Sequence, residues 1–230
     1  ALLGVNEDGM IFRADPGNNS NCGYVSAADL PAFKTAFSVY KESTINNINS
    51  DNINNNINLD NIKSVEPHSN IFGTEVRLER LQELFPQITN KNSFYISEEE
   101  VEKQIETIEV PIWNGTQNTT MKLSVHKKLK DNFLGAFQEL SELKFPINSK
   151  TTGAYNYRNT VDGSRLSDHA LGGTIDINPE VNPMTYGSNT NSSEKVVNED
   201  VVKIMAKYGF TWGGDWNGQK DYMHFSYTGG

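Results

Sequence analysis

Two short motifs in the second half of the chain contain residue types that can bind a metal ion. The first contains His169 and Asp176 on either side of a Gly-Gly pair, and the second is Asp221-Tyr-Met-His224. Two imidazoles and one carboxylate form a ligand set typical of a catalytic zinc ion, which leaves its fourth position to a water molecule. Asp221 stands three residues before the last histidine, where a general base for that water is expected. These motifs predict a metallohydrolase whose zinc ligands are His169, Asp176 and His224.

The composition excludes several classes of partner and site. The chain of 230 residues has a formal net charge of -9 and a pI near 5.0. Phosphate groups are bound by clustered lysines and arginines, so neither nucleic acid nor an anionic membrane surface is expected as the main partner. The single cysteine, Cys22, excludes an intramolecular disulfide framework and a thiolate-rich zinc site.

The sequence also bears on targeting. No apolar run approaches the roughly 18 residues that a membrane-spanning helix requires. The first residue is Ala1 rather than Met, as expected of a processed or shortened chain, in which a removed signal peptide would leave no trace.

The first hundred residues divide by composition and contain no motif that identifies a role. Residues 1–43 are expected to be a helical segment, because Asp29–Lys41 carries apolar residues at helical spacing. Residues 44–65 are rich in asparagine, whose side chain competes for backbone hydrogen bonds. We expect a flexible linker or a surface excursion there, with a short amphipathic helix or a solenoid turn as the alternative. Residues 66–104 are expected to form a helical lead-in to a catalytic domain over 105–230.

Apolar spacing predicts four helices in the lead-in and the domain that follows it. One helix begins at Ser97, because Glu100 completes a capping box there. Gly209 is the expected C-terminal stop of the last helix. The other predicted helices are Thr74–Phe85, Lys127–Leu143 and Glu199–Tyr208.

Alternation of polar and apolar residues predicts three strands, which are Tyr155–Arg158, Thr174–Asn178 and Met223–Tyr227. Side chains of a strand point alternately to its two faces, so Arg158, Asp176 and His224 are each expected on a polar face. The sequence therefore predicts an α+β domain with a small antiparallel sheet, helices packed on one face and the zinc site on the other. A mainly helical N-terminal region is expected in addition.

Five further residues are candidates for catalysis or substrate binding. Asp221 is interpreted as the general base, with a turn-capping role as its alternative. Arg158 is expected to hold a substrate carboxylate or to polarise the attacked carbonyl, unless it is a plain surface charge. Ser167 is expected to orient substrate or a metal ligand, or merely to begin a turn. Trp212 and Trp216 flank a Gly-Gly-Asp loop and are expected to wall a substrate cleft, although Trp212 would suit a core position equally well.

The motif Ser-x-His-x-x-Gly-x-x-x-Asp with a distal Asp-x-x-His resembles a family of zinc peptidases. The family includes D-Ala-D-Ala carboxypeptidases and the L-alanyl-D-glutamate endopeptidases of bacterial and phage cell-wall lysis. The resemblance covers about residues 105–230 and is closest to the endopeptidase-like branch. The phrases that carry it are, in chain order, Tyr157-Arg158, Leu166-Ser167-Asp168-His169, Ile175-Asp176-Ile177-Asn178, Asn182-Pro183, Gly209-Phe210-x-Trp212-Gly213-Gly214-Asp215-Trp216 and Asp221-x-Met223-His224-Phe225.

The resemblance implies a fold like that of the DD-peptidases and hedgehog proteins, with zinc as the cofactor. It assigns His169, Asp176 and His224 as zinc ligands, Asp221 as the general base and Arg158 as the arginine that contacts the substrate or the transition state. The implied reaction is metal-assisted hydrolysis of a peptide bond, in which the base takes a proton from water and returns it to the leaving amine.

The chain departs from the family pattern after the last ligand. Many carboxypeptidase members have glutamate as the base and a His-x-His ending, whereas this chain has Asp221 and then Phe225-Ser226. Gly173 and Thr174 also stand where small residues such as alanine are usual, which does not affect the metal ligands. These differences favour the endopeptidase branch.

We therefore expect a zinc-dependent peptidoglycan hydrolase that cuts the stem peptide, in first place at the L-Ala-D-Glu bond. A D-Ala-D-Ala carboxypeptidase or dipeptidase is the alternative. A non-catalytic cell-wall-binding module that retains the fold is an alternative of another class, against which the intact Asp221 argues. The expected protein is a monomer that acts outside the cell or in the cell wall, as a secreted bacterial enzyme or a phage lysin. The sequence leaves open which bond is cut and what residues 1–104 do.

Overall fold

The computed structural model describes residues 2–5, 10–13, 23–26, 57–185 and 196–230. The chain divides into two compact units, Ala1–Asn52 and Ile53–Gly230, which are described separately. The described part of the first unit is a three-stranded antiparallel sheet. Its strands are β1 (Leu2–Val5), β2 (Met10–Arg13) and β3 (Gly23–Ser26), in the order β1-β2-β3.

This sheet corrects the expectation of a helical segment at the start of residues 1–43. The strand residues include β-branched and aromatic types such as Val5, Ile11 and Tyr24, which favour extended backbone. Each strand is too short to show a clear alternation, so only pairing with its neighbours defines it. The helix predicted over Asp29–Lys41 and the asparagine-rich residues 44–56 lie outside the described residues.

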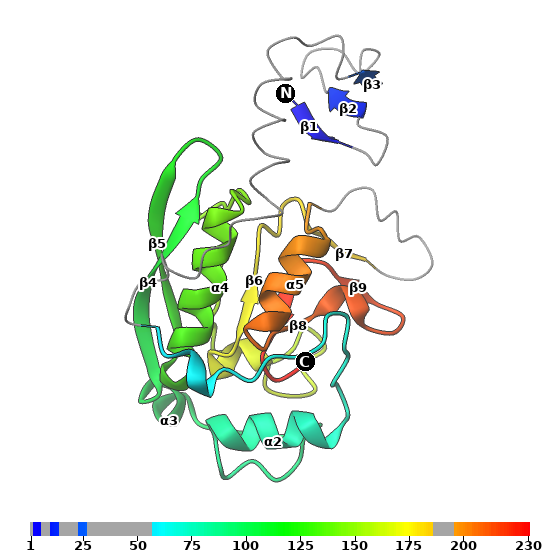
Figure 1. Ribbon diagram of the computed structural model, residues 1–230. Helices are drawn as coiled ribbons and strands as arrows, with labels where there is room; N and C mark the ends of the chain where they lie inside the picture. Colours follow the sequence, from blue (N-terminus) through cyan, green and yellow to red (C-terminus); the bar gives the residue numbers. More distant parts are fainter. Residues whose placement is uncertain (1, 6–9, 14–22, 27–56, 186–195) are drawn as a thin grey trace. The chain divides into compact units, whose positions relative to one another are not determined.

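The second unit contains a long β-hairpin that covers one helix. Strands β4 (Ile105–Trp113) and β5 (Asn118–His126) pair antiparallel along their whole length. Ile108, Val110 and Ile112 are buried on the face that packs against helix α4 (Lys130–Glu142). Figure 1 shows the hairpin, in green, along the side of α4. This hairpin was not predicted from the sequence, although Asn114-Gly115 between two alternating runs is a strong hairpin signal.

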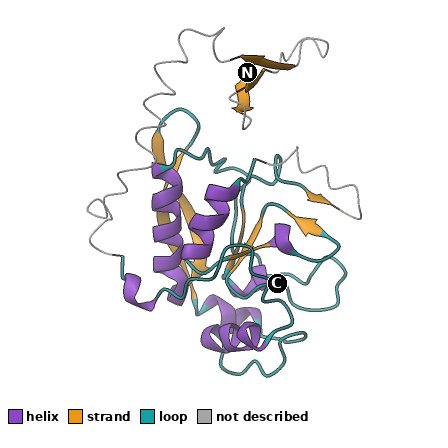
Figure 2. Ribbon diagram, turned by 45° about the vertical axis from the view of Figure 1, so that its right-hand side comes forward, coloured by secondary structure: helices purple, strands orange, loops and turns teal. Residues whose placement is uncertain are grey.

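A second sheet lies at the centre of the unit and carries the metal-binding motifs. It is antiparallel with the order β6-β10-β8 and consists of β6 (Thr174–Asp176), β10 (His224–Ser226) and β8 (Thr211–Trp212). Helices α4 and α5 (Glu199–Lys207) pack against each other, and α5 also contacts β8. Figure 2 shows these helices together in purple with strands beside them. The predicted α+β class with a small antiparallel sheet is therefore confirmed.

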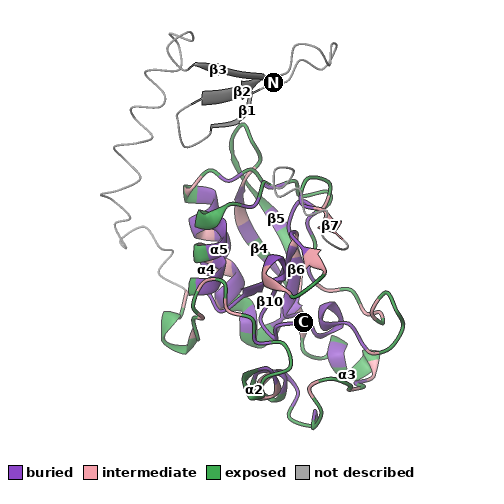
Figure 3. Cartoon of the chain, turned by 90° about the vertical axis from the view of Figure 1, so that its right-hand side faces the viewer, coloured by how far each residue is buried: buried purple, intermediate pink, exposed green. Residues whose placement is uncertain are grey.

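One apolar core joins the β4–β5 hairpin, helices α4 and α5 and the central sheet of the second unit. Phe133 and Phe137 of α4, Ile175 of β6 and Phe225 of β10 are all fully buried in it. The ring of Phe133 lies 4.8 Å from that of Phe210, between centroids, which joins α4 to the start of β8. Figure 3 shows this burial, with β6 and β10 largely coloured as buried and the turn of the β4–β5 hairpin coloured as exposed.

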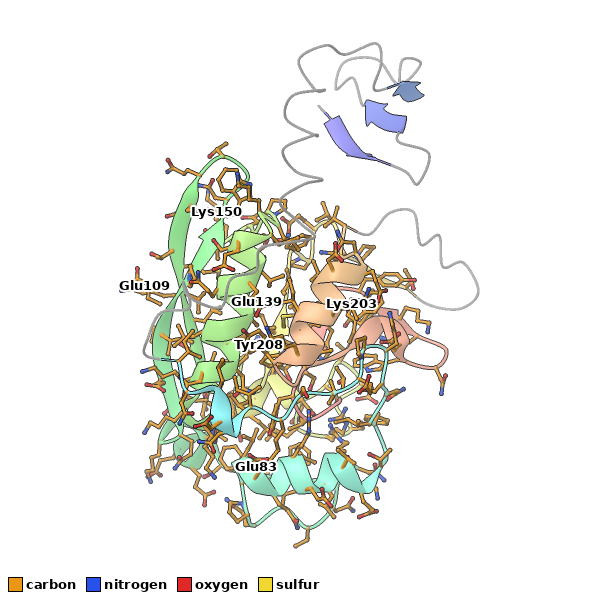
Figure 4. All side chains as sticks on the ribbon, viewed as in Figure 1. Glu83, Glu109, Glu139, Lys150, Lys203 and Tyr208 are labelled. Carbon is orange, nitrogen blue, oxygen red and sulfur yellow. The ribbon has the colours of Figure 1, made fainter. Side chains whose placement is uncertain are left out.

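A buried polar pair also joins α4 to the end of α5. The Tyr208 hydroxyl donates a hydrogen bond to Glu139 Oε1 at 2.7 Å, and burial of the phenol raises the pKa of Tyr208. Both residues are labelled in Figure 4. This contact gives the carboxylate of Glu139 a partner that an apolar helix interface would not provide.

The lead-in of the second unit contains two helices, which start where the sequence predicted them. Helix α2 (Glu75–Leu84) begins at its N-cap Thr74, and α3 (Glu98–Glu102) begins at Ser97 with both hydrogen bonds of the capping box to Glu100. The predicted helix over 127–143 is a 3-10 turn, η5 (Lys127–Leu129), followed by α4. The predicted last helix is α5, after which Gly209 has a φ of 89°.

The predicted strand Tyr155–Arg158 is wrong, because this segment is an extended loop. Its backbone hydrogen bonds go to two different segments, strand β5 and the turn formed by Ser167 and η6, instead of to one neighbouring strand. The Tyr155 amide donates to Ser124, the Asn156 amide donates to His169, and the Arg158 carbonyl accepts from Ser167. Alternating aromatic residues are compatible with such a loop, since extended backbone alternates its side chains whether or not it is paired.

The described part of the second unit contains five further short elements. They are η4 (Leu59–Asn61), η6 (Asp168–Leu171), β7 (Met184–Thr185), η8 (Gly213–Asp215) and β9 (Lys220–Asp221), and β7 pairs with β9. None of the helices in the described residues is long and apolar enough to cross a membrane.

Candidate metal centre

The central sheet places one carboxylate and one imidazole directly opposite each other. In the antiparallel pair of β6 and β10, Asp176 is the register partner of His224. His224 Nδ1 lies 3.2 Å from Asp176 Oδ1. Because both strands alternate their side chains in step, residues on the polar faces of the two strands meet here while Ile175 and Phe225 enter the core.

The second histidine reaches the same point from the 3-10 turn η6. Ser167 is the N-cap of η6, and its hydroxyl accepts a hydrogen bond from the His169 amide at 3.3 Å. His169 Nδ1 lies 2.8 Å from the Ala154 carbonyl oxygen, to which it can only donate. Its Nε2 is therefore the lone-pair nitrogen, and it lies 3.3 Å from Asp176 Oδ2. This nitrogen is buried and has no hydrogen-bond partner.

The three side chains fit a zinc ion. One ligand atom from each of His169, Asp176 and His224 can be chosen so that all lie within 4.8 Å of one another. Zinc bonds of about 2.0–2.1 Å in a tetrahedral arrangement put ligand atoms roughly 3.3 Å apart, which matches the 3.2 Å and 3.3 Å separations around Asp176. His224 Nε2 is 3.3 Å from the Gly230 carbonyl oxygen, so its proton can reside there and leave Nδ1 for the metal.

The charges of the group suit a cation. Burial raises the pKa of the Asp176 carboxyl, but the adjacent His169 and His224 imidazoles outweigh burial and hold that pKa below its usual value. Burial lowers the pKa of His224, while the Asp176 carboxylate raises it, and the net shift is upward. The ligand set therefore contains an ionised carboxylate, the form that a metal ion requires.

Asp221 lies beside this group with one carboxylate oxygen unpaired. It belongs to β9, is 5% exposed, and its Oδ1 is buried without a hydrogen-bond partner. Burial raises the pKa of its carboxyl above the usual value, and the Asp176 carboxylate adds to this while His224 opposes it. A buried carboxylate oxygen without a donor is costly unless a ligand or water completes it.

The Gly-Gly loop packs closely against both Asp221 and His224. A Cβ built on Gly213 would lie 2.6 Å from the Asp221 carbonyl oxygen and 3.1 Å from His224 Cβ. Only a residue without a side chain allows this approach, which gives a physical reason for glycine after Trp212.

A cleft of about 660 Å³ contains the ligand group. Its lining brings together most of the residues that the sequence singled out, which are Arg158, Ser167, His169, Asp176, Trp216, Asp221 and His224. The Trp216 ring lies 4.9 Å from the His224 ring, between centroids. Arg158 is half-buried and comes from the loop at 155–158 rather than from a sheet face.

Trp212 is the predicted site residue that the structure does not bring to the cleft lining. It is 6% exposed, its Nε1 donates to the Tyr222 carbonyl at 3.0 Å, and its ring stacks on Phe225. Of the two positions that the sequence left open, the structure therefore places Trp212 in the core.

Other cleft residues were not found from the sequence. Phe72, which is 47% exposed, and Arg165 line the same cleft, and the Arg165 guanidinium lies 5.7 Å from the Phe72 ring centroid. Phe72 lies far from the motifs in the sequence, in a loop before α2, so spacing could not reveal it. Arg165 stands close to the Ser-x-His motif, but its charge alone did not separate it from a surface residue.

Comparison with known families places the motifs in one matched segment. Residues 161–227 match a family model described as D-alanyl-D-alanine carboxypeptidase. The segment includes His169, Asp176, Asp221 and His224, whereas Arg158, α2 and the β4–β5 hairpin lie outside it. Comparisons with curated proteins and with solved structures gave no match.

Proposed function

We propose that this protein is a zinc-dependent peptidase of the peptidoglycan stem peptide, because residues 161–227 match a family model described as D-alanyl-D-alanine carboxypeptidase. The observation that carries the proposal is the group formed by His169, Asp176 and His224, whose ligand atoms lie within 4.8 Å in a cleft beside Asp221. His169 Nε2, Asp176 and His224 Nδ1 would hold the ion. When bound there, zinc would polarise a carbonyl and lower the pKa of water toward about 7.

Asp221 is proposed as the general base and acid. Its carboxyl is buried, its Oδ1 lacks a partner, and its pKa is raised. A carboxylate with a raised pKa accepts a proton from water more readily and can return that proton to the leaving amine. Both transfers require a side chain at the edge of the metal group, which is where Asp221 lies.

Arg158 is proposed to contact the substrate. Arg158 lines the cleft. In the described structure its guanidinium donates one hydrogen bond, from Nη1 to the Asn159 carbonyl at 3.2 Å. The planar guanidinium is suited to binding a carboxylate or the oxygen of the attacked carbonyl. Trp216 would pack against the peptide from the His224 side. Ser167 would act through His169, because its hydroxyl accepts a hydrogen bond from the His169 amide.

For the bond, we propose the L-Ala-D-Glu linkage, as an endopeptidase. A neighbouring lobe of about 300 Å³ shares Phe72, Arg165, Trp216, Gln219 and Gly230 with the main cleft and adds Asn70 and Asn217 to its lining. This space suits a peptide that continues beyond the scissile bond, which an endopeptidase must accommodate and a carboxypeptidase need not. The alternative is cleavage of D-Ala-D-Ala, which the description of the matched family favours.

A digest of purified bacterial cell wall tests these proposals together. Wall is incubated with the zinc-loaded protein, with the chelator-treated protein and with the Asp221→Asn variant, and newly freed termini are identified by mass spectrometry. New L-Ala carboxyl ends with new D-Glu amino ends support the endopeptidase, and released D-Ala supports the carboxypeptidase. Wall binding with no new terminus in any sample would contradict both and identify a binding module.

The proposed substrate also sets the proposed place of action. A peptidase of the stem peptide acts where the cell wall is accessible, as a secreted bacterial enzyme or a phage lysin. We propose that it acts as a monomer, because the ligand group and Asp221 all come from a single chain.

A further inference from the structure

A fully buried arginine joins helix α2 to both histidine-bearing segments of the candidate metal centre. Arg77 is 0% exposed and lies on α2, outside the segment that matches the peptidase family. Its guanidinium donates to Asp168 twice, from Nη1 at 2.6 Å and from Nη2 at 2.9 Å. It also donates to the Thr228 carbonyl at 2.7 Å and, through Nε, to the Lys91 carbonyl at 2.9 Å.

The first connection leads to His169. Asp168 immediately precedes this histidine in η6 and is itself buried, with further hydrogen bonds from Arg165 Nη1 at 2.8 Å and from the Thr228 hydroxyl. A bidentate pair fixes the carboxylate in direction as well as in distance. Since Asp168 and His169 are consecutive in one short turn, the pair with Arg77 sets the position from which His169 Nε2 faces Asp176.

The second connection leads to His224. The Gly230 carbonyl oxygen lies 3.3 Å from His224 Nε2, which leaves His224 Nδ1 to face Asp176. Gly230 packs directly on Arg77, because a Cβ built on this glycine would lie 2.5 Å from Arg77 Nη1. The guanidinium thus holds the backbone of Thr228 by a hydrogen bond and that of Gly230 by contact.

We propose that Arg77 is a positioning residue of the metal centre, acting on His169 through Asp168 and on His224 through the segment 228–230. The inference rests on the proposed zinc site and adds a residue from the lead-in helix to it. It also makes α2 part of the catalytic unit rather than a connection to it. Groups that hydrogen-bond to metal ligands typically change metal affinity by about 10- to 100-fold when they are removed. The Gly230 carbonyl is such a group for His224, and Arg77 acts through it.

The same helix supplies a matched control. Arg80 is 5% exposed and donates to the carbonyls of Gly209, Tyr227 and Lys63 at 2.6, 2.8 and 3.2 Å, with its guanidinium over the Tyr227 ring. It makes no hydrogen bond to Asp168 or to segment 228–230 in the described structure. Removing either arginine leaves buried acceptors without donors, so both changes should lower stability.

The test compares Arg77→Met with Arg80→Met in the full chain. Zinc affinity is measured by competition with a chelator, and thermal unfolding is measured on the zinc-free protein. We expect Arg77→Met to weaken zinc binding by about 10- to 100-fold and Arg80→Met to leave it within about twofold, although both lower the melting temperature. Arg77→Lys should recover part of the affinity, because one ammonium can still reach Asp168 but cannot form the bidentate pair.

Equal zinc affinities for the two methionine variants would overturn the inference. If Arg77→Met does not fold, Arg77→Lys is compared with Arg80→Lys, because lysine keeps the buried charge but cannot form the bidentate pair. Equal zinc affinities in these two variants would also overturn the inference. Failure of the proposed zinc site gives a different result, since the unmodified protein would then bind no zinc in the same assay, and failure of the proposed peptidase activity appears only in the wall digest.

Discussion

His224 Nδ1 and Asp176 Oδ1 lie 3.2 Å apart across the antiparallel strands β10 and β6. Sheet register holds this pair, so its geometry depends on backbone hydrogen bonds rather than on a flexible loop. Sites on such elements keep their ligand spacing before the metal binds, which favours affinity.

Replacing Asp176 by Asn should therefore remove the metal with little change in fold. The amide keeps the shape of the carboxylate but carries no charge, and the proposed zinc site loses the one anionic member of its ligand group. We expect zinc affinity to fall by more than about 100-fold, beyond the range for residues that only support ligands. Equilibrium dialysis followed by metal analysis measures this, and far-ultraviolet circular dichroism checks the fold. Stoichiometric zinc in the variant would exclude Asp176 as a ligand.

Asp221→Asn should separate catalysis from metal binding. Asn cannot accept a proton at neutral pH, so kcat should fall by about 10²- to 10⁴-fold, the usual contribution of general acid–base catalysis. Zinc content should stay at that of the unmodified protein, because Asp221 is not in the ligand group. Hydrolysis of a purified stem peptide is the assay, and undiminished kcat would remove Asp221 from the mechanism.

Arg158 should affect substrate more than metal. We expect Arg158→Ala to lower kcat/KM by about 10- to 100-fold with zinc affinity unchanged, since loss of a charged hydrogen bond costs roughly 1.5–3 kcal/mol. Arg158→Lys would restore little if the planar guanidinium makes two bonds. A rise in KM alone would indicate binding of a substrate carboxylate, whereas a fall in kcat would indicate contact with the transition state. Unchanged kinetics in both variants would contradict either role.

Gly213→Ala should disturb the site through packing. The added methyl would meet the Asp221 carbonyl oxygen at 2.6 Å, so η8 or β9 must shift. We expect reduced kcat and weaker zinc binding, because the same methyl also approaches His224 Cβ. Gly153→Ala is the control, since a Cβ at Gly153 meets nothing within 4 Å although this residue is hydrogen-bonded to Asp176. Equal effects of the two changes would contradict the packing argument.

His126 should make stability depend on pH between about 6.5 and 4. This histidine is fully buried, and burial, followed by the positive charge of Lys128, lowers the pKa of His126 from 6.5 to about 4. Within this window the unfolded chain binds a proton that the folded chain does not, so the free energy of unfolding falls as the pH falls. The loss from this residue is about 3 kcal/mol, at about 1.4 kcal/mol per pKa unit.

Urea unfolding of the metal-free protein at pH 7 and pH 4.5 measures this effect. The His126→Gln variant is less stable than the unmodified protein at pH 7 if packing is lost, but its stability should change less between the two pH values. An equal change in both proteins would show that His126 does not cause it.

Much of the local structure follows from the sequence. The capping box at Ser97 and Glu100 forms as predicted because it needs only residues three positions apart. Helices α4 and α5 were predicted correctly because each carries its apolar residues in one stripe at helical spacing, and that stripe is buried in the core. The wrong predictions have non-local causes. At 155–158 strand pairing depends on which backbone lies alongside, and two different segments do, strand β5 and the turn at 167–169.

The sequence by itself determined the set of possible ligands, since two histidines and two aspartates stand in motifs with few other chemical uses. Tertiary structure decided how they are used. Register across β6 and β10 brings Asp176 to His224, the turn η6 brings His169 Nε2 to the same carboxylate, and packing removes Trp212 from the cleft. It also brings Arg77 of α2 against the segments that hold both histidines. Spacing along the chain could not show this, because such contacts arise only when distant segments bury their polar groups together.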